Sequence, residues 1–245
     1  FHIHGRPCLG ICFRTVPGLS HSIMQTDLAE LKQVLETAAL AAGHAIMLIH
    51  NAGAHIRHKS DNSPVTEADE EAERVILAAL RRHFPAIPVV AEEAVAAGIV
   101  PDISGGRFFL VDPLDGTKEF VAGRSEFTVN IALIENRAPI AGIVFAPALS
   151  SGCVAVDNRA ERFTVADGRT IAERQAIGCR KHGAAITAVA SRSHDTPQTA
   201  RFLDDHGIDA CTAIGSSLKF CLVAEGIADV YPRFSRTMEW DTAAG

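Results

Sequence analysis

The sequence predicts an α+β protein, and three observations support this class. The first third contains two segments with the apolar spacing of amphipathic helices. The middle contains short runs rich in β-branched and aromatic residues, and the last third alternates strand-like and helix-like segments. With 245 residues, 47% hydrophobic and 21% charged, the composition is that of a globular protein and excludes a disordered or collagen-like chain.

The N-terminal region is predicted to contain two helices after an irregular leader. Residues 1–23 lack a steady period and the features of a signal peptide, so we interpret them as an extraneous leader. A capping-box-like opening at Asp27 predicts a helix that continues to near Gly53. Thr66 is a good N-cap for a second amphipathic helix, which is expected to end at about His83.

Short strands are predicted next, and two of them end in acidic residues. The strand Val89–Ala91 leads into Glu92, and the strand Phe108–Val111 leads into Asp112. Acidic side chains at strand ends are the first indication of a functional site. An antiparallel hairpin and two further strands extend the same sheet: Thr128–Ile134, Ile140–Phe145, Cys153–Val156 and Phe163–Val165.

The last third of the chain is predicted to form an α/β layer. Strands and helices alternate in it, at residues 185–190, 196–206, 210–214, 217–224 and 228–231. The change of pattern predicts two domains, 24–175 and 176–245. The final segment, Trp240–Gly245, is typical of a first helical turn with Asp241 as its N-cap, so we expect a helix that begins here and is cut off.

Charge and cysteine usage narrow the classes of partner. The formal net charge is −6 and the basic residues are scattered, which disfavours a nucleic acid polymer. The apolar stretches fall well short of the roughly 20 residues that span a bilayer, so no transmembrane helix is predicted. The six cysteines form no CxxC pair and are typical of reduced thiols in the cytosol. A soft-metal site at His2, His4, Cys8 and Cys12 lacks a scaffold and is not predicted.

The segment Val111–Phe120 carries the strongest chemical signal. It places Asp112 and Asp115 three residues apart around a proline. Two ionised carboxylates about 5 Å apart repel each other by roughly 3 kcal/mol at an effective dielectric constant near 20. A cluster that also gathers Glu92 and Asp241 would therefore need a cation, and its oxygen ligands indicate magnesium.

The residues after this acid pair suit a phosphate group. The backbone amides of Gly116 and Thr117 can face a phosphate oxygen, while bound metal ions neutralise the phosphate charge and lower the pKa of a bound water. This combination predicts phosphoester hydrolysis. Taken alone, the segment is also compatible with a simple turn, for which Pro, Asp and Gly are all suited.

The order of the motifs resembles the inositol monophosphatase superfamily of lithium-sensitive, magnesium-dependent phosphatases. The acid pair Glu92–Glu93 precedes a V-D-P-L-D-G-T signature at 111–117, a W-D-x-A-A-G signature stands at 240–245, and Val65–Asp69 precedes them all. The pair Lys118–Glu119 resembles the residues found at this position in the nucleotidase branch, whereas inositol phosphatases usually carry Thr-Asn there. Three later segments resemble the same branch: 191–194, 215–226 and 229–233.

This resemblance implies a layered αβαβα sandwich, truncated at its C-terminus, with two or three Mg²⁺ ions between the domains. The implied metal ligands are oxygen donors, namely Glu92, Asp112, the Leu114 carbonyl, Asp115 and Asp241. The implied catalytic residues are Asp69, Glu92 and Thr117, of which Thr117 and Asp69 match the pair that orients or activates the attacking water. Asp69 also suits the role of a capping-box acid, and the two roles can coexist. The implied substrate contacts are Glu92, Leu114, Asp115, Gly116, Thr117, His194, Ser216, Lys219, Arg233 and Asp241.

The implied reaction is hydrolysis of the 3'-phosphate of adenosine 3',5'-bisphosphate (PAP) to AMP and phosphate, in support of sulfate assimilation. The sulfated analogue PAPS is a second implied substrate. Two alternatives stay open: an inositol or sugar monophosphatase of the same superfamily, and an inactive metal-binding fragment that lacks the residues behind Asp241. The cytoplasm is the expected location, and no segment requires the attachment to the inner membrane that has been assigned to some relatives.

Overall fold

The chain folds into helices, a large sheet and two small sheets. The computed structural model describes residues 25–53, 56–58, 64–181, 183, 185–192 and 196–245, so the predicted leader 1–23 lies outside the described residues. The helices are α1 Gln25–Ala52, α2 Glu67–His83, α3 Glu92–Ala96, α4 Thr117–Val121, α5 Pro197–Asp205 and α6 Leu218–Ala224, with a 3₁₀ turn at Pro147–Leu149. The strands are β1 Ile56–His58, β2 Pro64–Thr66, β3 Val89–Ala91, β4 Arg107–Asp115, β5 Thr128–Glu135, β6 Ala138–Ala146, β7 Ser151–Val156, β8 Arg159–Ala166, β9 Thr170–Ile177, β10 Thr187–Ser191 and β11 Ala210–Ile214.

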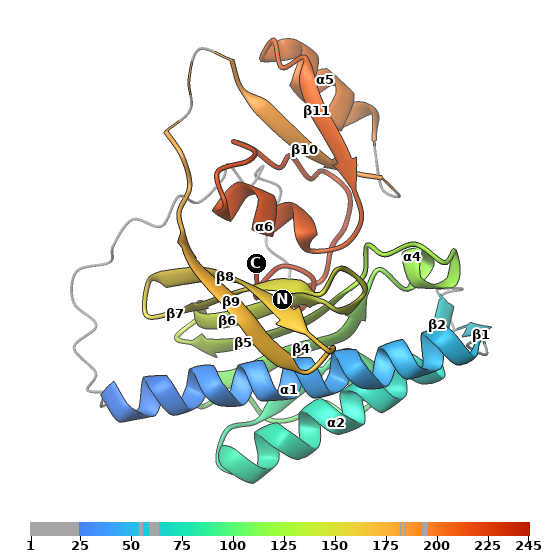
Figure 1. The fold of residues 1–245 in the computed structure, drawn as a ribbon, viewed down its shortest axis with the longest axis vertical. Coiled ribbons are helices and arrows are strands. Elements are labelled where there is room, and N and C mark those ends of the chain that lie inside the picture. The colour runs from blue at the N-terminus through green and yellow to red at the C-terminus, as the bar shows by residue number, and fades with distance from the viewer. Residues whose placement is uncertain (1–24, 54–55, 59–63, 182, 184, 193–195) are drawn as a thin grey trace.

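These elements are stacked in layers of alternating type (Figure 1). Helices α1 and α2 cover one face of the large sheet, and α6 lies against its other face. The parallel pair β10–β11 lies beyond α6, and α5 lies outermost. The predicted α+β class and its αβαβα layering are therefore confirmed. Among the described residues, no helix combines the length and apolarity needed to cross a membrane.

The second helix begins as its sequence predicts. The Thr66 side chain accepts a hydrogen bond at the start of α2, and the Asp69 carboxylate accepts the Thr66 N–H at 2.7 Å, which completes a capping box. Such a cap contributes about 1 kcal/mol and fixes the first turn of the helix. Because Asp69 is 2% exposed, this turn also buries an acidic side chain at the edge of the sheet.

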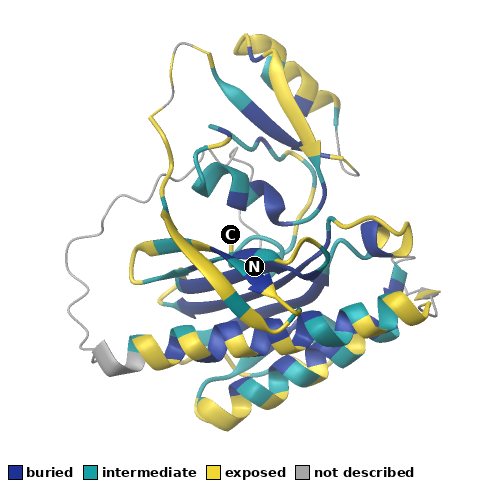
Figure 2. Ribbon diagram, viewed as in Figure 1, coloured by how far each residue is buried: buried dark blue, intermediate teal, exposed yellow. Residues whose placement is uncertain are grey.

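The large sheet has the strand order β3-β4-β5-β6-β7-β8-β9, with β3 parallel to β4 and the remaining pairs antiparallel. The predicted hairpin is formed by β5 and β6, whose turn residues Asn136 and Arg137 both have positive φ. The central strands of this sheet are buried along most of their length (Figure 2). Because side chains alternate between the two faces of a strand, their residues belong to two different cores. The larger core lies under α1 and α2 and includes Phe109 and Ile131, whereas Leu110 belongs to a smaller core on the opposite face.

Several elements were not predicted. Strand β9 pairs with β8, although most of its residues are exposed and half of them are polar, so its sequence carries little apolar alternation. Helices α3 and α4 have five residues each, too few for a helical period to be visible. The predicted strand at 228–231 is wrong, since the structure has only a single parallel bridge there, between Ala188 and Val230. The division into two domains stays a prediction, and the large sheet continues to Ile177.

The prediction of a helical first turn at the C-terminal segment is also wrong. Residues 239–244 form bends and turns. The Asp241 carboxylate accepts hydrogen bonds from Thr237 Oγ1 at 2.8 Å and from the Met238 N–H at 3.0 Å, so it closes a turn with residues that precede it. Trp240 and Ala244 pack against the smaller core of the sheet. Packing on the sheet and local turn hydrogen bonds, such as that from the Ala243 N–H to the Glu239 carbonyl oxygen at 3.0 Å, hold this segment.

Gly142 on β6 allows the C-terminal segment to approach the sheet. A Cβ atom at Gly142 would lie 2.6 Å from the Ala244 oxygen and 2.9 Å from Ala244 Cα. We expect Gly142→Ala to displace this segment and to cost about 1–3 kcal/mol of stability, a decrease in Tm of about 2–10 °C. Trp240 is the single tryptophan of the chain, so its fluorescence should shift to the red. Gly105→Ala is the control, because nothing lies within 4 Å of a Cβ at that position. An unchanged emission spectrum in Gly142→Ala would contradict the packing described.

Candidate active site

Strands β3 and β4 bring two acidic residues to neighbouring positions. In their parallel pairing, Ala91 stands beside Val111. The next residue of each chain is acidic, Glu92 after β3 and Asp112 within β4. Asp112 is 2% exposed, so one carboxylate of the pair is almost completely withdrawn from water.

A bulge in β4 turns Asp115 to the same face of the sheet as Asp112. Asp112 pairs with Asn130 of β5 and Asp115 pairs with Thr128, so three steps on β4 match two steps on β5. Without the extra residue, the two acids would lie on opposite faces. The Asp112 Oδ1 atom accepts the Leu114 N–H at 3.1 Å inside the bulge, which stabilises this conformation.

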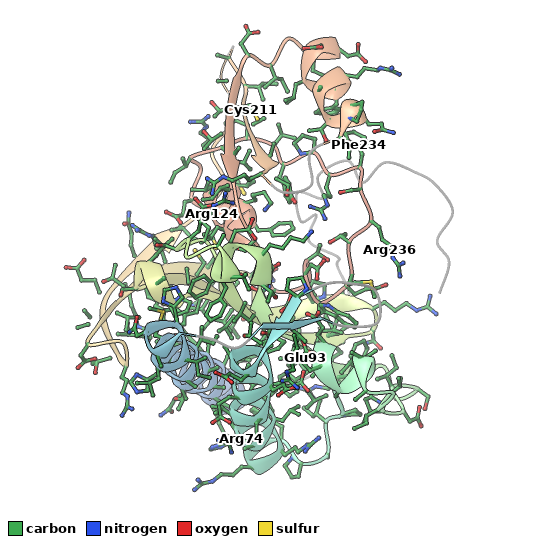
Figure 3. All side chains as sticks on the ribbon, turned by 90° about the vertical axis from the view of Figure 1, so that its right-hand side faces the viewer. Arg74, Glu93, Arg124, Cys211, Phe234 and Arg236 are labelled. Atoms are coloured by element: carbon green, nitrogen blue, oxygen red, sulfur yellow. The ribbon has the colours of Figure 1, made fainter. Side chains whose placement is uncertain are left out.

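Glu73 of α2 holds the turn that carries Glu92. Its two carboxylate oxygens accept the N–H groups of Glu93 and Ala94 at 2.8 and 2.9 Å. The N-cap residue of α3, Ala91, makes no side-chain cap, so Glu73 supplies one from another helix, and Figure 3 shows labelled Glu93 on α3 next to α2. Burial raises the pKa of Glu73, and the charges of Glu93 and Glu92 raise it further. Sequence reasoning missed Glu73, although it lies one helical turn after Asp69.

Asp69 and Thr117 meet next to the Leu114 carbonyl oxygen. Asp69 Oδ2 accepts hydrogen bonds from the Thr66 N–H and hydroxyl, both at 2.7 Å, and Oδ1 lies 3.2 Å from Thr117 Oγ1. The Thr117 hydroxyl is also 3.2 Å from the Leu114 carbonyl oxygen, so its one proton is shared between two acceptors. One oxygen of Asp69 therefore caps α2, and the other faces Thr117.

Ser217, directly before α6, connects three distant segments at this site. Its Oγ atom lies 2.7 Å from Asp115 Oδ2 and 2.9 Å from the Asp241 main-chain oxygen. Asn130 Nδ2 donates a hydrogen bond to the same Oγ at 2.8 Å. Neither Ser217 nor Asn130 was singled out from the sequence, because only the pairing of β4 with β5 and the position of α6 bring them to the acids.

Two of the predicted substrate contacts, Ser216 and Lys219, lie close to the beginning of α6. Ser216 touches Gly116, since a Cβ at Gly116, where φ is +93°, would lie 3.3 Å from Ser216 Cβ. Lys219 is 3% exposed, and its ammonium group donates to the carbonyl oxygens of Ser216 and Ile214. The pKa of Lys219 is lowered to about 8, mainly by burial, with a smaller contribution from the charge of Arg233 and against the charge of Asp115.

One predicted contact is not placed by the structure, and another points elsewhere. His194 lies outside the described residues. The Asp241 carboxylate faces Thr237 and Met238, while its main-chain oxygen faces Ser217. The structure thus brings the C-terminal segment to the site without directing every oxygen of Asp241 toward Asp112.

The negative charges in this cluster repel one another. Burial raises the pKa of Asp112 well above its ordinary value of 3.8, and four negative charges raise it further, those of Glu92, Asp115, Asp241 and Asp69. Burial also raises the pKa of Asp115 to about 6, against the hydrogen bond from Ser217. Since the fold leaves these like charges together, a bound cation would relieve their repulsion.

The donor atoms fit a hard divalent cation. Mg²⁺ in proteins usually keeps several waters and is held by one or two carboxylates together with phosphate oxygens of a substrate. In the described part of the chain, no group of three His, Cys, Asp or Glu side chains is arranged so that it could hold a metal ion by itself. The side chains as placed supply only part of the ligands of such an ion, and water and phosphate oxygens would have to supply the others.

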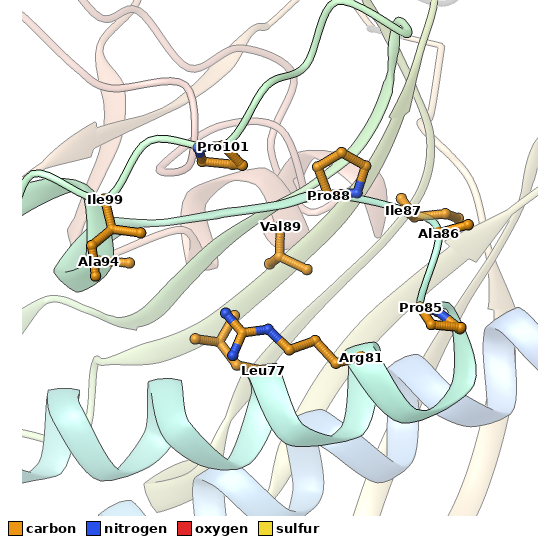
Figure 4. A pocket seen from close by; sticks show the side chains of 10 residues that line it. All are labelled: Leu77, Arg81, Pro85, Ala86, Ile87, Pro88, Val89, Ala94, Ile99 and Pro101. Carbon is orange, nitrogen blue, oxygen red and sulfur yellow. The ribbon is translucent and has the colours of Figure 1, made fainter.

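One cavity of the described chain lies away from these residues. It has a volume of about 370 Å³ and an apolar wall that contains one charged side chain (Figure 4). Its lining residues are Leu77, Arg81, Pro85, Ala86, Ile87, Pro88, Val89, Ala94, Ile99 and Pro101. None of the predicted site residues is among them, so this cavity offers neither carboxylates for a metal ion nor the Thr117 hydroxyl.

Comparison with known proteins identifies the family. The model of the inositol monophosphatase family matches residues 27–245. The 3'(2'),5'-bisphosphate nucleotidases CysQ of Salmonella typhimurium and Escherichia coli K12 are 45% and 43% identical to this chain, and each alignment covers 88% of the chain and 85% of the relative.

A solved structure agrees with these relatives. The crystal structure of CysQ from Bacteroides thetaiotaomicron, a bacterial member of the inositol monophosphatase family, superposes with a TM-score of 0.70 at 37% identity, over 88% of this chain and 83% of that chain. The resemblance noted in the motifs is confirmed. The chain belongs to the inositol monophosphatase family.

Proposed function

We propose that this chain is a 3'(2'),5'-bisphosphate nucleotidase that hydrolyses the 3'-phosphate of PAP to AMP and phosphate, with PAPS as a second substrate. Relatives at 43–45% identity carry this activity in their names, which supports the substrate class. The observation that carries the proposal is the cluster of like charges around buried Asp112, next to the Thr117–Asp69 pair. Such a cluster suits a metal-dependent phosphatase, as the family is, generally with Mg²⁺.

The metal ligands in this proposal are those that the motifs imply. Glu92, Asp112, the Leu114 carbonyl, Asp115 and Asp241 would hold two or three Mg²⁺ ions, at the boundary of the two proposed domains. When bound, the ions would neutralise the phosphate charge and lower the pKa of a water molecule. Glu73 would keep Glu92 in place through its bonds to the following amides.

The chain's own residues would orient the attacking water. The Thr117 Oγ1 atom can accept a proton from the water while its own proton passes to Asp69 Oδ1, 3.2 Å away. Asp69 is held for this task by two hydrogen bonds to Oδ2, from the Thr66 N–H and hydroxyl. The resulting hydroxide would attack phosphorus as the bond to the 3'-oxygen breaks, and the leaving 3'-oxygen would take a proton from a solvent water, so no covalent intermediate is needed.

The substrate contacts would come from both sides of the site. The amides of Gly116 and Thr117 begin α4, and the first amides of a helix lack acceptors within it. Lys219, with a pKa of about 8, is largely cationic at neutral pH and lies near Arg233, so the two support binding of a second phosphate. Ser216 and His194 complete the proposed contacts with the nucleotide.

The test is phosphate release from PAP in the presence of Mg²⁺, with and without Li⁺, beside inositol 1-phosphate at the same concentration. We expect PAP to be preferred and Li⁺ to inhibit. Preference for inositol 1-phosphate would favour the inositol phosphatase alternative, and no release from either would favour an inactive fragment.

The location of this activity is a proposal as well. We propose that the enzyme works in the cytoplasm, which the free thiols of the described cysteines Cys153, Cys179 and Cys221 support.

A further inference from the structure

We propose that the Ser217 hydroxyl is a positioning group for the metal site, which sets the Asp115 carboxylate and the main chain at Asp241 relative to each other, and that Asn130 in turn orients this hydroxyl. The inference rests on the proposed function and deepens it, since it assigns a role to two residues outside the implied ligand set. Ser217 is 2% exposed and Asn130 is 1% exposed, so water cannot readily replace their hydrogen bonds.

The direction of the hydrogen bonds follows from the donors. Asn130 Nδ2 donates to Ser217 Oγ, and this interaction uses a lone pair of the hydroxyl oxygen. The hydroxyl proton is then left for the two acceptors opposite, Asp115 Oδ2 at 2.7 Å and the Asp241 carbonyl oxygen at 2.9 Å. The shorter bond goes to the carboxylate, as expected for a charged acceptor.

The hydroxyl does not serve the helix that it precedes. A serine at an N-cap ordinarily accepts a hydrogen bond from an amide of the first turn. Ser217 is the N-cap residue of α6, yet its side chain makes no capping bond there. Its hydrogen-bonding capacity is directed to the acid cluster instead, which distinguishes it from Thr66 and Thr196, the N-caps of α2 and α5.

The contacts also join parts of the chain that are far apart in the sequence. Ser217 is separated by 102 residues from Asp115, by 87 from Asn130 and by 24 from Asp241. Asp115 ends β4 and Asp241 lies in the C-terminal segment, so the spacing between these two proposed ligands depends on the contacts between the two segments. A single hydroxyl that touches both fixes this spacing.

The Mg²⁺ affinity of Ser217 variants tests this role. Loss of a group that orients a metal ligand typically weakens metal binding by about 10–100-fold. We expect Ser217→Ala to raise by at least about tenfold the Mg²⁺ concentration that is needed for a given increase in Tm over the value in EDTA. The Mg²⁺ concentration for half-maximal PAP hydrolysis should rise by the same factor, while the Tm in EDTA shows whether the variant is folded. The Ser217 main-chain N–H also bonds to Asp115 and is retained in this variant.

Two matched variants separate positioning from packing. Ser217→Thr keeps the hydroxyl and should restore most of the Mg²⁺ affinity. Thr199→Ala removes another buried hydroxyl near the beginning of a helix, bonded to Thr196 at 3.1 Å, and should lower the Tm without changing the Mg²⁺ dependence. If Ser217→Ala behaves like Thr199→Ala, the residue only stabilises the fold and the inference is overturned.

A double-mutant cycle tests the part assigned to Asn130. If Asn130 acts through Ser217, Asn130→Ala will weaken Mg²⁺ binding in the wild-type background but add little to Ser217→Ala. If the effects of the two substitutions on Mg²⁺ binding are additive, Asn130 does not act through Ser217 and this part of the inference is overturned.

The Tm measurement needs no substrate, so it tests Ser217 even if PAP is not hydrolysed and the proposed function fails. A wild-type protein that neither binds Mg²⁺ nor releases phosphate would overturn both proposals.

Discussion

Asp112→Asn will abolish PAP hydrolysis and will stabilise the metal-free protein. Activity falls because the variant loses the buried carboxylate at the centre of the proposed metal site, and we expect a decrease in kcat/KM of at least about 10³-fold. Stability rises because Asp112 is buried among four negative charges. A neutral side chain of the same shape removes this repulsion.

The effect on stability depends on pH in a defined direction. The pKa of Asp115 is about 6 in the folded state against an ordinary value of 3.8, and the pKa of Asp112 is also raised. A raised carboxyl pKa means that folding favours the protonated form, so the metal-free protein loses stability as pH rises from about 4 through 6 and beyond. For Asp115 alone, a shift of about two pKa units corresponds to about 3 kcal/mol.

Thermal unfolding in EDTA between pH 5 and pH 8 checks this prediction. The Tm of Asp112→Asn should exceed that of the wild type by about 5 °C at pH 8, and the difference should shrink toward pH 5. Excess Mg²⁺ should raise the Tm of the wild type more than that of the variant. A variant that is less stable than the wild type at pH 8 in EDTA would show that repulsion between the carboxylates does not destabilise the metal-free protein.

Thr117→Val will lower kcat by about 10²–10⁴-fold while changing the Tm by little, because it removes the hydroxyl next to Asp69 and keeps the shape of the side chain. Thr117→Ser should keep most of the activity. Steady-state rates at saturating PAP and Mg²⁺ measure the effect. If Thr117→Val retains full kcat, the Thr117–Asp69 pair has no part in activating water.

Asp69→Asn will reduce activity to a similar extent and will also destabilise α2, because the same carboxylate caps the helix at 2.7 Å from the Thr66 N–H. The expected loss of stability is about 1 kcal/mol. Thr196→Ala provides the matched control, since it removes an N-cap from α5 and should cost a similar stability without affecting hydrolysis. A comparable loss of activity in Thr196→Ala would mean that destabilisation alone explains the effect of Asp69→Asn.

The elements that the sequence predicted are those whose signals are local. The cap at Thr66 and the hairpin of β5 and β6 follow from residues a few positions apart, and the structure confirms both. The candidate site residues, by contrast, came from motifs. The shared face of Asp112 and Asp115 depends on a one-residue bulge, which the proline between them permits but which their spacing does not establish.

Ser217 and Glu73 show what a single sequence leaves open. Ser217 reaches Asp115 only because α6 packs against the sheet, over a separation of 102 residues. Glu73 has the sequence pattern of an ordinary helical acid until α3 is folded beside α2, where its carboxylate accepts two amides. Contacts of this kind depend on tertiary packing, which cannot be predicted from local propensity and residue spacing.

Leu114 links the evolution of stability to that of activity. Its side chain is 2% exposed and belongs to the core under α1 and α2, while its carbonyl oxygen lies 3.2 Å from the Thr117 hydroxyl. A substitution selected for tighter packing at this position would also move an oxygen atom of the site, because both belong to one residue of the bulge. We therefore expect substitutions in proteins with this arrangement to be tolerated better at Ile76 or Phe145 than at Leu114. A change of the Leu114 side chain would also affect the reaction.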